Sequence, residues 1–209
     1  MGEVVLSKRL QRIAELVTGR CVLDVGCDHG LLSKYLLQNG LCERVIASDI
    51  SQKSLQKLDW TNEHLCKRVG DGLSVIDGRD GVDTIVVAGM GGETICGILQ
   101  GNTFCADLIV SPQSKVHLVR TQIAKMGYAL VEDFVLLDGK YYTILKAKWC
   151  PESTPVYDDN QLLYGVYYTK DKVQKQQLSQ RYQSLCQKKN EKANQKAQQL
   201  ACVLQSFEL

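Results

Sequence analysis

The residues of this sequence best suited to chemistry are acids that follow strand-like segments. The segment Asp24-Val25-Gly26-Cys27-Asp28-His29-Gly30 comes directly after an apolar run and before a helical pattern, which is the context of a ligand-binding turn. Gly26 would let a nucleotide-like ligand approach the backbone, and free N–H groups at the helix start suit a carboxylate. A dinucleotide-binding turn has glycine at position 28, because an acid there would face two phosphates. Asp28 therefore favours S-adenosylmethionine (SAM), which carries a sulfonium cation and no phosphate; a purely structural turn is the alternative.

Two further acids complete the predicted adenosyl pocket. Asp49 ends the next strand-like run, where its carboxylate can accept hydrogen bonds from both ribose hydroxyls, although an acid there is also a common helix cap. Asp71 lies in the turn Gly70-Asp71-Gly72-Leu73 and can accept from the adenine amino group, or be an ordinary turn residue. The recurrence of acids after successive strands favours the pocket. Its predicted cofactor contacts are Asp24, Gly26, Cys27, Asp28, Asp49, Ile50, Asp71 and Gly72.

A glycine-rich turn after a later strand is expected to face the reactive methyl group. The segment Ala88-Gly89-Met90-Gly91-Gly92-Glu93 follows a buried run, and the carboxyl ends of such strands face the ligand in a doubly wound sheet. After the next strand, Pro112 would fix the backbone of the opposite wall and Gln113 could hydrogen-bond a base. A glycine-rich connection without function is the alternative. We predict that Ala88, Gly89 and Met90 contact the cofactor and that Gly91, Gly92 and Pro112 contact the substrate.

The elements that must position these residues alternate between strand and helix. Helical patterns follow each of three apolar runs, at residues 21–25, 45–47 and 84–88, and this alternation predicts βαβ units with a parallel sheet. A strand at 108–110 and a helix at 114–126 are expected next, and Asp138-Gly139 then joins two extended runs as a hairpin. An amphipathic helix capped by Ser7 opens the chain. The expected fold class is α/β, the Rossmann-like doubly wound sheet of class I SAM-dependent methyltransferases.

The composition changes after Trp149. Pro151 and Pro155 punctuate a polar segment, which predicts a SAM-binding domain over residues 1–150 and a second domain over 151–209. One short helix is expected near Leu162. We expect a helical hairpin of the coiled-coil type beyond it, with a weak apolar seam at 188–196. The apolar residues that recur there near a 3.5-residue spacing are Leu178, Tyr182, Leu185, Leu200, Leu204 and Phe207.

The overall composition excludes several other classes. The chain has 209 residues, is 44% hydrophobic and begins without the charged-then-apolar order of a secretory signal, and no apolar run reaches the ~20 residues that span a bilayer. Its nine cysteines are scattered, several within apolar runs, so we expect reduced, buried thiols and no metal site. The formal net charge of +2 requires that any nucleic-acid surface come from local basic clusters. We expect a cytoplasmic monomer with no membrane partner.

Over nearly its whole length, the chain resembles the bacterial tRNA (adenine-22-N1)-methyltransferases of TrmK type. The Asp28-His29 pair with the run from Ala88 to Gly92 is the most specific part of the likeness. The resemblance implies a class I methyltransferase domain, a C-terminal coiled-coil domain, SAM as cofactor and methylation of adenine N1 at position 22 of tRNA. Gln113 stands where the family usually has asparagine, so a polar contact there would be one methylene longer. The matching segments are Leu6-Ser7-Lys8-Arg9-Leu10, Asp24 to His29, Gly70 to Leu73, Ala88 to Gly92, Gly127-Tyr128 and Asp138 to Tyr142.

Methyl transfer to adenine N1 requires placement rather than a strong base, because N1 already carries a lone pair. We expect Asp28 and Gln113 to be the catalytic residues, with Asp28 accepting a hydrogen bond from the exocyclic amino group and stabilising the cationic product. N1 lies on the Watson–Crick edge, so the adenine must leave its stack, and folded tRNA is the expected substrate. The alternatives are a small-molecule methyltransferase, which would not need the tail, and a noncatalytic RNA-binding protein, which would lack SAM affinity.

Basic residues near both ends of the chain are the predicted tRNA contacts. Lys8, Arg9 and Arg12 lie on the polar side of the opening helix, and His29 adjoins Asp28. For each lysine alone a solvated face is the alternative, whereas the basic excess of the tail favours RNA. The lysines of the tail are Lys170, Lys172, Lys175, Lys188, Lys189, Lys192 and Lys196.

Overall fold

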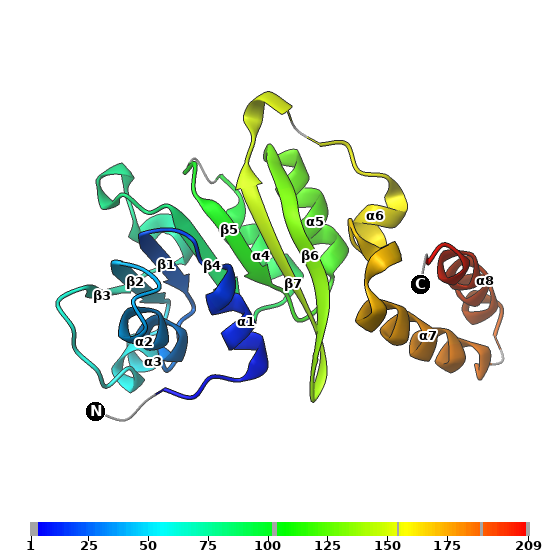
Figure 1. Cartoon of the computed structure of the whole chain (residues 1–209), viewed down its shortest axis with the longest axis horizontal. Coiled ribbons are helices and arrows are strands. Elements are labelled where there is room, and N and C mark those ends of the chain that lie inside the picture. Colours follow the sequence, from blue (N-terminus) through cyan, green and yellow to red (C-terminus); the bar gives the residue numbers. More distant parts are fainter. Residues whose placement is uncertain (1–3, 102–103, 154, 189, 208–209) are drawn as a thin grey trace.

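A seven-stranded mixed sheet runs through the centre of the computed structural model (Figure 1), which describes residues 4–101, 104–153, 155–188 and 190–207. The strand order is β3-β2-β1-β4-β5-β7-β6. The first five strands in this order are parallel to one another, and β7 is antiparallel to both β5 and β6. The strands are β1 (Cys21–Val25), β2 (Arg44–Asp49), β3 (Leu65–Val69), β4 (Thr84–Ala88), β5 (Asp107–Ser111), β6 (Tyr128–Asp138) and β7 (Lys140–Trp149). This is the Rossmann-like sheet with a closing hairpin that the sequence predicts.

Helices cover both faces of the sheet because its central strands are apolar on both sides. Leu23, Ile85 and Leu108 pack with α4 and α5, whereas their neighbours Val22 and Val86 pack with α1 and α2. Two apolar layers of this kind leave the strand ends as the place where polar residues can gather. The helices are α1 (Lys8–Leu16), α2 (Leu31–Gln38), α3 (Gln52–Lys57), α4 (Gly92–Leu99), α5 (Val116–Lys125), α6 (Asp159–Tyr164), α7 (Lys172–Cys186) and α8 (Glu191–Gln205).

The sequence analysis leaves one strand undelimited, and one of its expectations needs correction. The sequence pattern does not delimit β3, because this edge strand carries the charged residues Lys67 and Arg68 and is only partly buried. The expectation of buried thiols is wrong for Cys105, Cys186 and Cys202, which are exposed, although all nine cysteines are free. Both errors have one cause, since burial of residues at an edge or on a peripheral helix depends on neighbours that the local pattern does not specify.

The hairpin of β6 and β7 holds α1 at both ends. Ser7 caps the helix by accepting a hydrogen bond from the Leu10 N–H, and the Arg9 N–H donates to the Asp138 carboxylate at the hairpin turn. At the other end, the buried Lys146 ammonium on β7 donates to the Leu16 carbonyl at 2.8 Å. A cation at a helix C-terminus complements the orphan carbonyls and the helix dipole. These contacts fix α1 across the sheet.

A buried ion pair attaches the chain beyond residue 151 to the sheet. Arg120 on α5 and Asp133 on β6 are 2.8 Å apart, with side chains 2% and 0% exposed. Asp133 also accepts from the Val166 N–H at 2.7 Å, and Arg120 donates to the Leu162 carbonyl at 3.1 Å. The ion pair thereby satisfies backbone groups of α6 and of the turn that follows. The same buried side chains that neutralise each other also bind the linker to the sheet.

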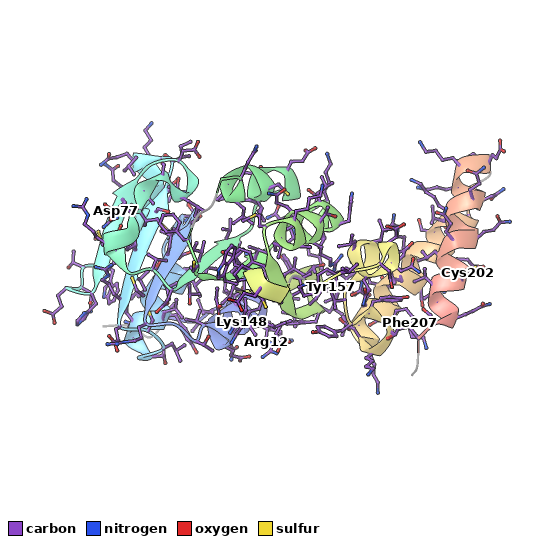
Figure 2. All side chains as sticks on the ribbon, turned by 90° about the horizontal axis from the view of Figure 1, so that it is seen from above. Arg12, Asp77, Lys148, Tyr157, Cys202 and Phe207 are labelled. Atoms are coloured by element: carbon purple, nitrogen blue, oxygen red, sulfur yellow. The ribbon has the colours of Figure 1, made fainter. Side chains whose placement is uncertain are left out.

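The last two helices form the predicted hairpin beyond the β6 edge, far from β3 (Figure 1). The helix breaks at the start of the predicted weak seam: α7 ends at Cys186, and Asn190 caps α8 by accepting from the Ala193 N–H. The rest of the seam is helical, and Ala193 is buried in it. Phe207 lies where α8 returns toward the linker (Figure 2), edge-on to the Tyr168 ring at 5.7 Å. The hairpin therefore has a small apolar cluster of its own.

The buried pair predicts a large loss of stability in Asp133→Ala. The substitution leaves the Arg120 guanidinium buried without its counter-charge, which typically costs about 3–5 kcal/mol. We expect that decrease in the free energy of unfolding in urea titrations of the full chain. The matched control is Glu15→Ala, which removes the exposed partner of Arg12 and should cost at most about 1 kcal/mol. Equal, small losses in both variants would contradict the anchoring role.

Candidate active site

A cavity of ≈ 300 Å³ opens at the carboxyl ends of β1 and β4. In a doubly wound sheet this is where the helices on the two faces diverge and ligands bind. The cavity collects residues from α1, the turn after β1, the start of α2 and the turns after β4 and β5. The lining residues are Arg9, Leu10, Asp24, Gly26, Cys27, Asp28, His29, Leu31, Leu32, Ala88, Gly89 and Gln113.

The turn after β1 is tied to β2 through its backbone. The N–H groups of Gly26 and Cys27 both donate to the Ser48 carbonyl, at 2.8 and 3.0 Å. Gly26 has φ +71°, which favours glycine, and the Met90 methyl group lies where a Cβ would project. Met90 therefore covers Gly26 in this structure, and the turns after β1 and β4 are in direct contact.

Asp24 is a buried acid in the wall of the cavity. Its side chain accepts a hydrogen bond from the Ser33 hydroxyl at 2.6 Å, and burial raises the pKa of Asp24 to about 6 despite that bond. Burial also raises the pKa of the Cys27 thiol to about 12. Cys27 is therefore a neutral wall residue, whereas Asp24 can become a strong partner for a cationic group that enters the cavity.

Asp28 differs from Asp24 in exposure and in charge environment. Its side chain is half exposed and lies 2.7 Å from the Lys57 ammonium and 3.5 Å from His29 Nε2. The hydrogen bond from Lys57 lowers the pKa of Asp28, so the group is a carboxylate at neutral pH. Asp28 also has φ +45°, an uncommon conformation for a residue other than glycine. No motif in the sequence identifies Lys57, because it reaches Asp28 from α3 across the fold.

The turns after β4 and β5 brace each other. Gln113 donates its backbone N–H to the Met90 carbonyl at 2.8 Å, and its exposed side chain is at the cavity. Gly92 is buried, and a Cβ there would lie 2.6 Å from the Ser114 carbonyl oxygen. Pro112 is buried as well. The geometry gives Gly92 and Pro112 a packing role, and their contact with substrate stays a prediction, as does that of Gly91.

The predicted adenosyl contacts lie beside this cavity rather than in it. Asp49 follows Ser48 at the end of β2 and accepts from the Ser51 N–H at 2.8 Å. The helix cap considered as its alternative is Ser51 instead, whose side chain accepts from the Ser54 N–H at the start of α3. Ile50 is 72% exposed. Asp71 and Gly72 line a neighbouring hollow against α4. Asp28, Asp49 and Asp71 thus follow the carboxyl ends of the adjacent strands β1, β2 and β3, as expected. Of these three acids only Asp28 lines the cavity, together with Ala88 and Gly89.

The predicted basic contacts are divided by the fold. Arg9 lines the cavity, while Lys8 is exposed and the Arg12 guanidinium packs over the Phe134 ring at 5.0 Å. Lys189 lies outside the described residues. The other tail lysines are exposed or half exposed, about α7 and α8: Lys170, Lys172, Lys175, Lys188, Lys192 and Lys196.

The described part of the chain contains no group of His, Cys, Asp and Glu side chains arranged to hold a metal ion. Among its helices, none is long and apolar enough to cross a membrane. The chemistry available in the cavity is that of two acids in different protonation environments, the imidazole of His29, an amide and a guanidinium.

The raised pKa of Asp24 predicts a pH-dependent gain of stability in Asp24→Asn. Asp24 keeps its proton up to about pH 6 in the folded protein, whereas an unfolded aspartate loses its proton near pH 4. The stability of wild type that depends on protonated Asp24 is therefore fully present below about pH 4 and is lost as pH rises through about 6. In urea titrations, the difference between variant and wild type should grow by about 2–3 kcal/mol from pH 4 to pH 7. The exposed Asp59→Asn is the control. A difference that does not change with pH would contradict the assignment.

The comparisons with known proteins agree with this geometry. Residues 6–145 match the family described as "Methyltransferase domain". The tRNA (adenine(22)-N(1))-methyltransferase of Bacillus subtilis is 35% identical over 188 residues, covering 82% of this chain and 78% of that one. Its tRNA methyltransferase TrmK superposes with a TM-score of 0.76 at 29% identity, over 99% and 98% of the two chains. A Streptococcus pneumoniae protein in complex with S-adenosyl-L-methionine superposes with a TM-score of 0.83 at 26% identity, over 98% of each. The chain belongs to the methyltransferase-domain family and, within it, to the bacterial tRNA (adenine(22)-N(1))-methyltransferases.

Proposed function

We propose that the protein transfers a methyl group from SAM to N1 of adenine 22 in tRNA. The observation that carries the proposal is the position of Asp28: an ionised acid held at the mouth of a cavity at the end of β1, opposite the glycine turn after β4. An acceptor of this kind suits a base whose ring becomes cationic when it is methylated. The protein is proposed to act as a monomer in the cytoplasm, where tRNA is found.

The residues around the cavity fit the cofactor. Asp24 is a buried acid suited to the ammonium group of the methionine part, and the row formed by Asp49 and Asp71 at the neighbouring strand ends suits the ribose and the adenine. The orphaned Arg9 Nη1, a buried donor without a partner in the described structure, supplies a site for a carboxylate. When bound, SAM supplies an electrophilic methyl group, so the protein has to position the target rather than activate a strong nucleophile.

Asp28 and Gln113 are the residues proposed to act on the target base. Asp28 would accept a hydrogen bond from the exocyclic amino group of the adenine, which raises the electron density at N1 and stabilises the positive charge of the product. Lys57 keeps Asp28 ionised in the free protein. Gln113 carries an exposed amide at the other side of the cavity and can bond the base edge. The base has to leave its stack to reach them.

The positive φ of Asp28 decides which substitutions test this role. Glycine and asparagine both tolerate the left-handed region, so Asp28→Gly and Asp28→Asn remove the carboxylate without the strain that alanine adds. We expect Asp28→Gly to lower the single-turnover methylation rate by about 100- to 1000-fold, the usual cost of losing one preorganised electrostatic contact. Asp28→Asn should be a partial rescue, because its carbonyl still accepts a hydrogen bond but carries no charge. Methylation is measured on tRNA, and the modified nucleotide is mapped by mass spectrometry.

SAM affinity, measured by calorimetry on the same preparations, separates the possible roles of Asp28. Little change in affinity beside a large loss of rate is the expected result, because the contact forms with the target base in the transition state. A loss of affinity proportional to the loss of rate would move Asp28 to the cofactor. Wild-type turnover in Asp28→Gly would remove it from the mechanism.

The C-terminal helices are proposed to be a tRNA-binding domain that begins near residue 151. Exposed lysines on α7 and α8 and in the turn between them support this. These helices stand beyond the β6 edge of the sheet (Figure 1), whereas the cavity lies at the ends of β1 and β4. A flipped nucleotide in the cavity leaves the body of a tRNA outside it, where phosphates need positive partners. A small-molecule methyltransferase would have no use for that surface.

Neutralising these lysines should weaken tRNA binding in a salt-dependent way. In a Lys188→Gln, Lys192→Gln, Lys196→Gln variant we expect the slope of log affinity against log salt to fall by about 1 for each lysine that contacts a phosphate. The Lys→Arg variant at the same positions keeps the charge and is the control. SAM affinity should be unchanged in both. If the neutral variant keeps the wild-type salt slope and affinity for tRNA, the helices do not bind its backbone.

A further inference from the structure

Arg9 is the basic side chain of the cavity that is not committed to an acid. Its Nη1 is buried and has no hydrogen-bond partner among the described residues. The guanidinium faces the turn after β4, because a Cβ on Gly89 would lie 3.7 Å from Nη1 and 3.8 Å from Nη2. An unpaired buried donor is unfavourable, so the site is arranged for an acceptor that enters the cavity.

The fold holds this guanidinium in place without using its N–H groups. The Tyr142 ring of β7 lies under it, 4.9 Å from the guanidinium carbon to the ring centroid. Asp138 fixes the Arg9 backbone N–H, and Lys146 holds the far end of the same helix. A guanidinium stacked on a ring keeps its donors free in its own plane. The arrangement leaves Arg9 preorganised for a planar anion such as a carboxylate.

The charges of the cavity match an amino-acid group. The lining contributes Asp24, a buried acid with a raised pKa, and Arg9, a fixed cation, while Asp28 already pairs with Lys57. An α-amino acid carries one ammonium and one carboxylate next to each other. The buried acid Asp24 can pair with the ammonium, and the unpaired guanidinium of Arg9 can pair with the carboxylate.

We propose that Arg9 binds the carboxylate of the methionine part of SAM. This rests on the proposed function and replaces the expectation that Arg9 contacts the tRNA backbone. A phosphate of the substrate is the other oxyanion to consider, but the orphan Nη1 is buried inside the sheet end next to Gly89, whereas a nucleic-acid backbone runs over the surface. Arg12, one turn along α1, has the surface position instead, with an exposed ion pair to Glu15.

The test uses two ligands that differ only in the carboxylate. SAM and decarboxylated SAM are titrated into the full-length wild type and into Arg9→Met, which keeps the length of the side chain but has no donor. We expect Arg9→Met to bind SAM about 10- to 100-fold more weakly, the range for losing a charge-assisted hydrogen bond. Decarboxylated SAM should bind the wild type and Arg9→Met equally. The control Arg12→Met, on the same helix, should leave the affinity for SAM unchanged.

The outcomes separate this inference from the proposed function. Equal SAM affinity in Arg9→Met and wild type overturns the inference, and weaker tRNA binding in that variant would assign Arg9 to a phosphate. Equal loss of affinity for both ligands would also overturn it, since the effect would not depend on the carboxylate. If the thermal transition of Arg9→Met shows that this variant misfolds, Arg9→Lys gives the same comparison with the charge kept. Arg9→Lys should bind SAM more weakly than wild type but more tightly than the range expected for Arg9→Met. If wild type binds no SAM at all, the proposed function fails instead.

Discussion

The antiparallel pairing of β7 with β5 and β6 carries the contacts that position both functional parts of the molecule. On β7, Lys146 and Tyr142 hold α1 and aim Arg9 into the cavity. On β6, Asp133 binds Arg120 and the turn that leads to the C-terminal helices. Both sets of contacts lie on one hairpin, whose ladder is continuous from the pair Glu132–Lys146 to the turn, beyond a register shift between Leu130 and Glu132. A change in the hairpin register would displace the cavity wall and the tail together.

Burial and pairing push two neighbouring acids in opposite directions. Asp24 is enclosed, and burial raises its pKa to about 6, whereas Asp28 is half exposed and the ammonium of Lys57 lowers its pKa. The site thus has, within one turn of chain, a buried acid that can pair with a cationic ligand group and an exposed acid that is ionised at neutral pH. This division follows from Ser33 near the start of α2, which bonds Asp24, and from Lys57 at the end of α3, which pairs with Asp28. It matches a reaction in which positive charge is present on the cofactor and develops on the target.

The C-terminal helices are attached to the sheet through a buried ion pair and the backbone groups that it bonds. Arg120 and Asp133 satisfy backbone groups on both sides of Gly165, whose φ of +125° favours glycine, and a Cβ there would lie 3.3 Å from both side chains. A buried ion pair gains stability only when its remaining donors and acceptors are bonded, and here the linker backbone supplies them. Tyr157 and Val166 of the linker also pack against the sheet core, whereas the helices beyond keep a separate apolar cluster.

Local sequence determined much of this molecule. The strands at 21–25 and 84–88 appear at the predicted residues, because a strand buried on both faces must be continuously apolar, and the Asp138-Gly139 turn formed because few dipeptides fit a tight hairpin. The turn after β1 and the acids at the strand ends were visible for the same reason, since they occur where regular elements stop. The family resemblance added the target nucleotide, which no residue pattern here specifies.

Tertiary structure decided which of these residues face one another. Lys57 reaches Asp28 from α3, Met90 covers Gly26, and Gly92 packs on the carbonyl of Ser114; each contact joins segments far apart in the chain, and their types alone give no pairing. The edge strand β3 was not delimited, and three exposed cysteines were wrongly expected to be buried, because burial at the periphery depends on what packs against it. The role of Arg9 is the clearest case: sequence made it a basic residue on an amphipathic helix, and only the docking of α1 on the hairpin turned its guanidinium inward, where a buried donor requires a partner.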